Sequence, residues 1–255
     1  PAALLNARHA VVPFFGREVL IKEIRAWCDE PAHVRARLVH GSGGMGKTRL
    51  FIEACAQMRR EGWRAGFLSG GIDTRQFEML LATERPTLTV IDYAESRPDL
   101  RDLLKAAARL RVGKGRGRLR LVLLARNAGD WWTSLRGSDA ELEILLGDHA
   151  PRELPPLVLA GPARTAAFQQ AAAHFAHLMR KAPPDAAPTL DDRRYNRMLY
   201  IHMAALAAVE GRRFIGIERD AHYFQVAARR LDAAAEGIIL PAGRTASQAG
   251  AAMAS

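Results

Sequence analysis

The stretch from Gly41 to Thr48 constrains this chain more than any other. It reads Gly-Ser-Gly-Gly-Met-Gly-Lys-Thr and fits the pattern G-x-x-x-x-G-K-[ST] without a mismatch. Glycines allow a turn in which successive backbone N–H groups point inward at phosphate oxygens. Lys47 adds a positive charge, and the Thr48 hydroxyl is a ligand for Mg²⁺. We therefore predict a nucleotide-binding phosphate loop. Its members are Gly41, Ser42, Gly43, Gly44, Met45, Gly46, Lys47 and Thr48.

The residues around this loop supply the strand and the helix that the motif requires. Residues 37–40 are a short β-prone run, and residues 48–58 carry apolar side chains at helical spacing. A helix that begins at the loop presents its positive N-terminal end to an anion. The alternative is a glycine-rich turn that matches the pattern by chance. The flanking elements argue against it.

Composition is that of an ordinary globular protein. Of 255 residues, 49% are hydrophobic and 25% are charged, and this length holds one large α/β domain or two smaller ones. No run approaches the roughly 18 apolar residues of a membrane span, and no signal-peptide pattern opens the chain. We therefore expect a cytoplasmic location and no membrane partner. Cys28 and Cys55 fall in predicted amphipathic helices and are expected to be buried thiols. The chain begins at Pro1, so a fragment is an open interpretation.

The net charge of +10 admits a nucleic-acid partner. The densest group of basic residues surrounds a glycine-containing stretch and comprises Arg109, Arg111, Lys114, Arg116, Arg118 and Arg120. No aromatic residues are interleaved with them to stack on bases. We interpret the group as a solvated loop. A DNA-binding ATPase stays an alternative, and a steep salt dependence of DNA affinity would favour it.

A strand that ends in an acidic residue follows the loop in the sequence. Residues 87–95 read as a buried strand that ends in an acid, Asp92, with Glu95 three positions further on. A carboxylate at the tip of a neighbouring strand holds Mg²⁺, usually through water. Another carboxylate close by orients or deprotonates the attacking water. We assign the first role to Asp92 and the second to Glu95, whose direction depends on the turn after Asp92.

The segment Phe14-Phe15-Gly16-Arg17-Glu18 resembles the h-h-G-R-E signature that precedes the phosphate loop in STAND-type and related AAA+-like ATPases. Residues 91–97 and 123–126, followed by Trp131 and Trp132, are also similar to those proteins, and the resemblance covers roughly residues 14–210. It implies that the segment containing Arg17 lies against adenine and that Arg126 senses the γ-phosphate. We interpret the two tryptophans as hydrophobic anchors beneath a loop.

The same resemblance implies ATP and Mg²⁺ as cofactors. ATP rather than GTP follows from the resemblance, and the chain has no N/T-K-x-D base-reading motif. Helices predicted over residues 163–181 and 191–209 would form a lid that closes over the nucleotide.

The tail carries a different resemblance. Residues 211–231 are similar to the C-terminal segment of N4/N6 amino-group DNA methyltransferases, in which an acid at a strand end bonds the ribose of S-adenosylmethionine. Glu218 would take that place. The glycine-rich cofactor loop of those enzymes should lie just upstream, but residues 195–202 contain no glycine. The D-P-P-Y-type tetrad does not occur anywhere in the sequence. A βα appendage or a fusion remnant is therefore favoured over methylation by this chain alone.

These observations predict an α/β P-loop NTPase with a parallel sheet of about five strands flanked by helices. The predicted organisation is an N-terminal segment (1–13), a core (14–160), a helical lid (161–210), a βα tail (211–240) and a disordered end (241–255). The predicted function is MgATP binding with slow hydrolysis, used as a switch on a protein partner or on an effector or repeat domain outside this chain. A fragment related to a methyltransferase and a non-hydrolysing ATP-binding scaffold are further alternatives.

Overall fold

The structure is a computed structural model that describes residues 2–110, 117–147, 149–157, 159 and 161–212. The predicted βα tail from residue 213 onward, with Glu218, and the end predicted to be disordered lie outside the described residues. The same holds for Arg111, Lys114 and Arg116 of the basic group. None of the helices described is long and apolar enough to cross a membrane.

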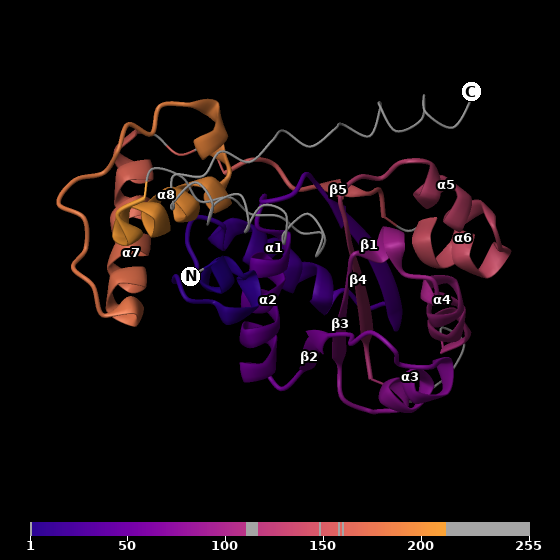
Figure 1. Ribbon diagram of the computed structural model, residues 1–255. Helices are drawn as coiled ribbons and strands as arrows, with labels where there is room; N and C mark the ends of the chain where they lie inside the picture. Colours follow the sequence, from indigo (N-terminus) through magenta and orange to yellow (C-terminus); the bar gives the residue numbers. More distant parts are fainter. Residues whose placement is uncertain (1, 111–116, 148, 158, 160, 213–255) are drawn as a thin grey trace, which may run out of the picture. The chain divides into compact units, whose positions relative to one another are not determined.

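A five-stranded parallel sheet in the order β2-β3-β4-β1-β5 is the framework of the fold (Figure 1). The strands are β1 (Val34–His40), β2 (Arg64–Phe67), β3 (Thr87–Asp92), β4 (Leu119–Ala125) and β5 (Arg152–Glu153). This confirms the predicted α/β fold with a parallel sheet of about five strands. Because all the strands run the same way, their carboxyl ends meet at one edge, where ligands of open α/β sheets bind.

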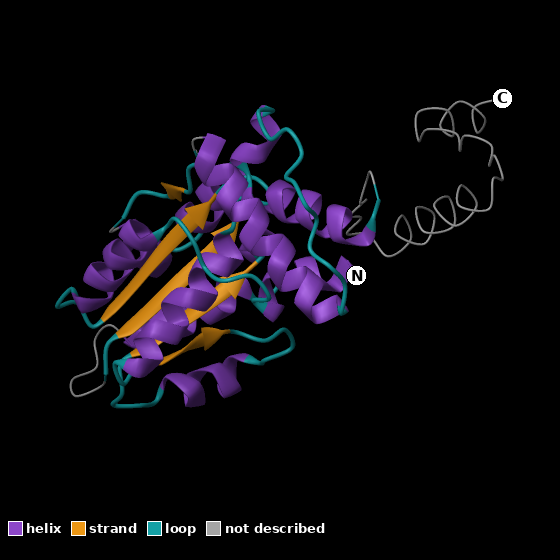
Figure 2. Ribbon diagram, turned by 90° about the vertical axis from the view of Figure 1, so that its left-hand side faces the viewer, coloured by secondary structure: helices purple, strands orange, loops and turns teal. Residues whose placement is uncertain are grey.

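Helices cover both faces of the sheet (Figures 1 and 2). One face carries α1 (Glu18–Asp29) and α2 (Lys47–Arg60), and the other carries α3 (Thr74–Leu81), α4 (Leu100–Arg109), α5 (Asp130–Gly137) and α6 (Ala140–Gly147). Side chains alternate along β4 between these two layers. Val122 and Leu124 pack in the core beneath α1 and α2, and Leu121 and Leu123 pack in the core beneath α3 to α6. A strand buried on both faces reads as a continuous apolar run.

The prediction of a single helix over residues 191–209 is wrong. Residues 191–209 contain a 3₁₀ helix, η5 (Arg193–Asn196), followed by α8 (Met198–Glu210). Asp192 starts the short helix by accepting a hydrogen bond from the Arg194 backbone N–H at 2.8 Å, and such local bonds compete with a continuous α-helix. Between the two, Arg197 has extended backbone angles (φ −108°, ψ 119°). The first of the two predicted helices is present as α7 (Gly161–Met179), which packs along α8.

Two further segments differ from the sequence-based expectation. Residues after β4 form α5 and α6, where a loop over two tryptophan anchors was expected. Both tryptophans belong to α5; Trp132 is buried and Trp131 is half-buried against the core. The prediction that they are hydrophobic anchors is therefore correct, and the prediction of a loop is wrong. The N-terminal segment contains the short 3₁₀ helices η1 (Ala2–Leu5) and η2 (Ala7–His9).

The two cysteines are buried free thiols, as expected. Burial raises the pKa of both Cys28 and Cys55 to about 12, so these thiols stay protonated and unreactive at neutral pH.

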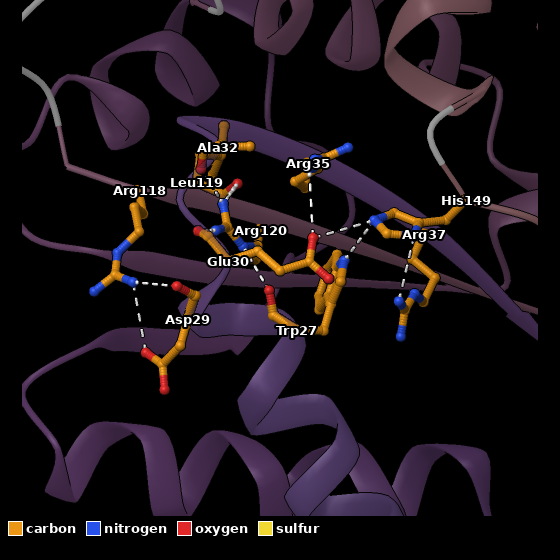
Figure 3. A network of polar contacts seen from close by, with 10 residues as sticks. All are labelled: Trp27, Asp29, Glu30, Ala32, Arg35, Arg37, Arg118, Leu119, Arg120 and His149. Carbon is orange, nitrogen blue, oxygen red and sulfur yellow. Dashed lines mark hydrogen bonds and ion pairs between the residues drawn. The ribbon is translucent and has the colours of Figure 1, made fainter.

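A buried polar network joins the end of α1 to β1 and β4 (Figure 3). Arg120 lies on β4, has no exposed surface, and so is not part of a solvated loop. Its guanidinium donates to the main-chain oxygens of Trp27 (3.2 Å) and Ala32 (2.9 Å), and also to that of Glu30. These carbonyls belong to the C-terminal end of α1 and the turn after it, where a helix leaves acceptors unpaired and its dipole favours a cation.

Candidate nucleotide-binding site

The loop between β1 and α2 has the backbone geometry of an anion-binding nest. Gly44 and Gly46 have left-handed φ values of 78° and 87°, which side chains other than glycine adopt only with strain. Within the described chain, the backbone N–H groups of Gly43, Gly44, Met45 and Gly46 donate to no protein acceptor. A run of successive donors that the protein itself does not use is suited to phosphate oxygens.

Three charged or polar side chains stand at this loop. The Lys47 ammonium donates to the carbonyl oxygens of Gly41 and Ser42, the latter at 3.3 Å, so it lies against the loop backbone. The Thr48 hydroxyl, in the first turn of α2, donates to Asp92 Oδ2 at 3.0 Å. Asp92 is the last residue of β3, and β4 separates that strand from β1. The fold thus brings together a hydroxyl and a carboxylate that are 44 positions apart in the sequence. Both are hard oxygen ligands of the kind that Mg²⁺ prefers.

The turn after Asp92 directs Glu95 toward β4. Tyr93 has a left-handed backbone (φ 56°, ψ 43°), and the short helix η3 (Ala94–Ser96) follows it. The Asp92 Oδ1 atom accepts the Tyr93 N–H at 3.0 Å, which holds this turn. Glu95 Oε1 accepts the backbone N–H of Arg126 at 3.1 Å, and its Oε2 is buried with no hydrogen-bond partner in the described chain. A buried, unpartnered carboxylate oxygen is costly in free energy and often marks a functional position.

The predicted sensor, Arg126, immediately follows β4. Its side chain is exposed, and its main chain rather than its guanidinium contacts Glu95. The structure therefore brings the predicted sensor and the predicted base together, at the edge of the sheet where Asp92 also lies.

Arg17 contacts the loop itself. It precedes α1 and is buried, with 8% of its surface exposed. Its Nη2 atom donates to the carbonyl oxygen of Met45 at 3.0 Å and to that of Pro155 at 2.9 Å. The resemblance implied that its segment lies against adenine, whereas the observed partners of the side chain are backbone atoms of the loop and of the residues after β5.

Sequence reasoning missed one contact between the loop and the helical region. Leu199, in the first turn of α8, lies so close to Gly44 that a Cβ atom there would be 3.1 Å from the leucine side chain. Nothing in the sequence indicates this contact, because it depends on how α7 and α8 pack beside the core. It places the start of α8 directly on the phosphate loop.

His202, one turn further along α8, should make stability depend on pH. Its imidazole packs edge-on against Phe175, with ring centroids 6.3 Å apart, and burial, aided by the charge of Arg49, lowers its pKa to about 4. An unfolded chain takes up this proton near the ordinary pKa of 6.5. Between those values the unfolded state binds more protons, so stability falls as the pH is lowered. We expect His202 to contribute a loss of about 2–3 kcal/mol by about pH 4.

Urea unfolding at several pH values tests this expectation. Wild type and His202→Phe are compared, since phenylalanine keeps the packing and removes the titrating group. The difference between their unfolding free energies should change over the acid range, and a constant difference would contradict the prediction.

Of the comparisons with known proteins, only the one with solved structures finds similar proteins. No protein-family model and no curated protein matches the chain. Among solved structures, the chain is similar to the ORC2 protein of Aeropyrum pernix in its ADPNP–ADP complexes: the TM-score is 0.52 and the identity 12%, over 89% of this chain and 77% of that one. At this identity the likeness shows the fold alone. The fold is that of the P-loop ATPases of the AAA+ type.

Two further structures are similar at lower scores. Cdc6p from Pyrobaculum aerophilum has a TM-score of 0.48 and 14% identity, over 81% of this chain and 67% of that one. NtrX from Brucella abortus in complex with ATP has a TM-score of 0.47 and 13% identity, and the 89% of this chain that aligns spans 61% of the NtrX chain.

Proposed function

We propose that the protein binds MgATP at the loop between β1 and α2 and hydrolyses it slowly. The observation that carries this proposal is the hydrogen bond between Thr48 and Asp92, at 3.0 Å, beside backbone N–H groups that have no protein acceptor. In this proposal the loop amides and Lys47 bind the phosphates, and Thr48 and Asp92 hold Mg²⁺. The metal would neutralise phosphate charge and orient the reacting group.

Glu95, in η3 after β3, and Arg126, which follows β4, are proposed for the later stages. Glu95 would orient the attacking water, and the geometry of its carboxylate supports this: one oxygen is anchored on the Arg126 backbone and the other is buried without a partner. The exposed Arg126 side chain would respond to the γ-phosphate.

We further propose that the nucleotide acts as a conformational switch of the STAND type. The contact between Leu199 and Gly44 supports this role, because phosphates that enter the loop would bear on the start of α8. A shift of this helix could be passed to a protein partner or to a domain outside this chain. A switch requires that the two states of α8 differ in their contacts with the nucleotide.

Calorimetry on the full chain tests the binding proposal. MgATP and, separately, S-adenosylmethionine are titrated into wild type and Lys47→Ala, with Lys22→Ala, an exposed lysine of α1, as the matched control. Loss of a charge-assisted contact of about 1.5–3 kcal/mol should weaken binding by roughly 10–100-fold in Lys47→Ala, with little change in the control. A wild type that binds S-adenosylmethionine but not MgATP would refute the proposal. Binding of MgATP without phosphate release would leave the non-hydrolysing scaffold as the function.

A further inference from the structure

The peptide group between Met45 and Gly46 is held from outside the loop by Arg17. The guanidinium reaches the Met45 carbonyl oxygen at 3.0 Å in a buried contact. Every peptide bond described is trans, so the C=O of Met45 and the N–H of Gly46 point in opposite directions. Fixing the carbonyl toward Arg17 therefore turns the Gly46 N–H away from it. That N–H has no acceptor within the described chain.

The same guanidinium ties the loop to the end of the sheet. Arg17 also donates to the Pro155 carbonyl oxygen at 2.9 Å. The segment that contains Pro155 is itself fixed to β1, because the Leu154 N–H donates to His40 at 2.8 Å. One side chain thus connects the loop to a segment that is hydrogen-bonded to the end of β1. Glycine-rich backbone with left-handed residues gains most from such a restraint, since its own conformational freedom is large.

The charge of Arg17 is not matched by a carboxylate. Among the described residues no acidic group lies within ion-pair distance of it, and its partners are two carbonyl oxygens. Burial lowers its pKa, which reflects the cost of the cation in this position. An anion bound in the adjacent loop would reduce that cost, so the buried cation favours phosphate over water.

We propose that Arg17 is a positioning residue that holds the Met45–Gly46 peptide so that the Gly46 N–H faces the phosphates. This inference rests on the proposed nucleotide site. It departs from the adenine role that the resemblance implied, because it assigns Arg17 to the phosphate end of the ligand. Arginine suits the task because the two hydrogens of its Nη2 atom have fixed directions in the planar guanidinium, whereas a lysine ammonium rotates freely.

The test separates the phosphates from the base. Binding of MgATP and of magnesium tripolyphosphate, which has no base or sugar, is measured for wild type, Arg17→Met and Arg17→Lys. The control is Arg25→Met; Arg25 is an exposed arginine of α1, the helix that Arg17 precedes, and pairs with Glu61. We expect both ligands to bind Arg17→Met about tenfold more weakly, with an intermediate loss in Arg17→Lys and none in the control.

Other results would overturn the inference and leave the proposed function standing. If Arg17→Met binds both ligands as tightly as wild type, a positioning role is excluded. If only its affinity for MgATP falls, Arg17 is a contact of the base. The amide resonance of Gly46 gives a readout that a general loss of stability would not move: it should shift on tripolyphosphate binding in wild type and less in Arg17→Met. If Arg17→Met does not fold, Arg17→Lys carries the comparison. A wild type that binds neither ligand would instead refute the proposed function.

Discussion

Replacing Arg120 by alanine should lower the free energy of unfolding by about 3–5 kcal/mol. The guanidinium has no exposed surface and donates to the main-chain oxygens of Trp27, Glu30 and Ala32. Alanine removes this donor from all three oxygens; that of Trp27 keeps the Glu30 N–H at 3.3 Å, whereas those of Glu30 and Ala32 lose the guanidinium. A buried acceptor costs about 1–3 kcal/mol when it is unpaired. The change also removes the aliphatic part of the side chain and a cation–π contact 5.9 Å from the Trp27 ring.

Urea unfolding followed by tryptophan fluorescence measures this loss. Arg118→Ala is the matched control, since Arg118 is two residues away, is 40% exposed and pairs with Asp29 at 3.5 Å. A surface pair of this kind contributes about 0–1 kcal/mol. Arg120→Met separates the two effects, because it keeps most of the buried volume and removes only the donors. If Arg120→Ala costs no more than the control, the carbonyls must find other donors, and the contacts of Arg120 in Figure 3 are not the source of stability.

The burial of Arg120 shows why the sequence alone misassigns it. Basic residues surround it in the chain, and a charged cluster near glycines ordinarily indicates solvent. Its environment is set by main-chain carbonyls at the end of α1 and in the turn after it, which precede it by about ninety positions. Along β1 the same face carries Arg35, directly opposite Arg120 in the register, and Arg37. The predicted strand, 37–40, is therefore too short, because β1 begins at Val34 and these arginines conceal its pattern.

The phosphate loop and its acidic partner were predictable for the opposite reason. The loop depends on local residue types at a fixed spacing. The position of Asp92 follows from the rule that parallel strands end at one edge of the sheet. The direction of Glu95 did not follow, because it depends on the left-handed backbone of Tyr93, a conformation that a tyrosine seldom adopts. The contact of Leu199 with Gly44 could not be predicted either, since it depends on the extended residue Arg197, which separates η5 from α8.

Asp92→Asn should reduce MgATP hydrolysis by roughly 10²–10³-fold, the range found when a group that stabilises developing charge is removed. The substitution keeps the shape of the side chain and an oxygen that can accept the Tyr93 N–H. It removes the negative charge that Thr48 and the metal would share. The affinity for MgATP should then approach the affinity for ATP in the presence of a chelator, because the variant no longer gains from the ion.

Phosphate release and calorimetry with and without Mg²⁺ measure the two parts of this prediction. Asp73→Asn is the matched control: Asp73 caps α3, which packs on the opposite face of the sheet from α2, and asparagine is an equally good capping residue. Thr48→Val should resemble Asp92→Asn, and the double variant should lose less than the two single losses combined, because the residues are hydrogen-bonded and act on one ion. Strict additivity would mean that Thr48 and Asp92 do not share a metal. An Asp92→Asn protein with unchanged Mg²⁺ dependence would place the ion on other residues altogether.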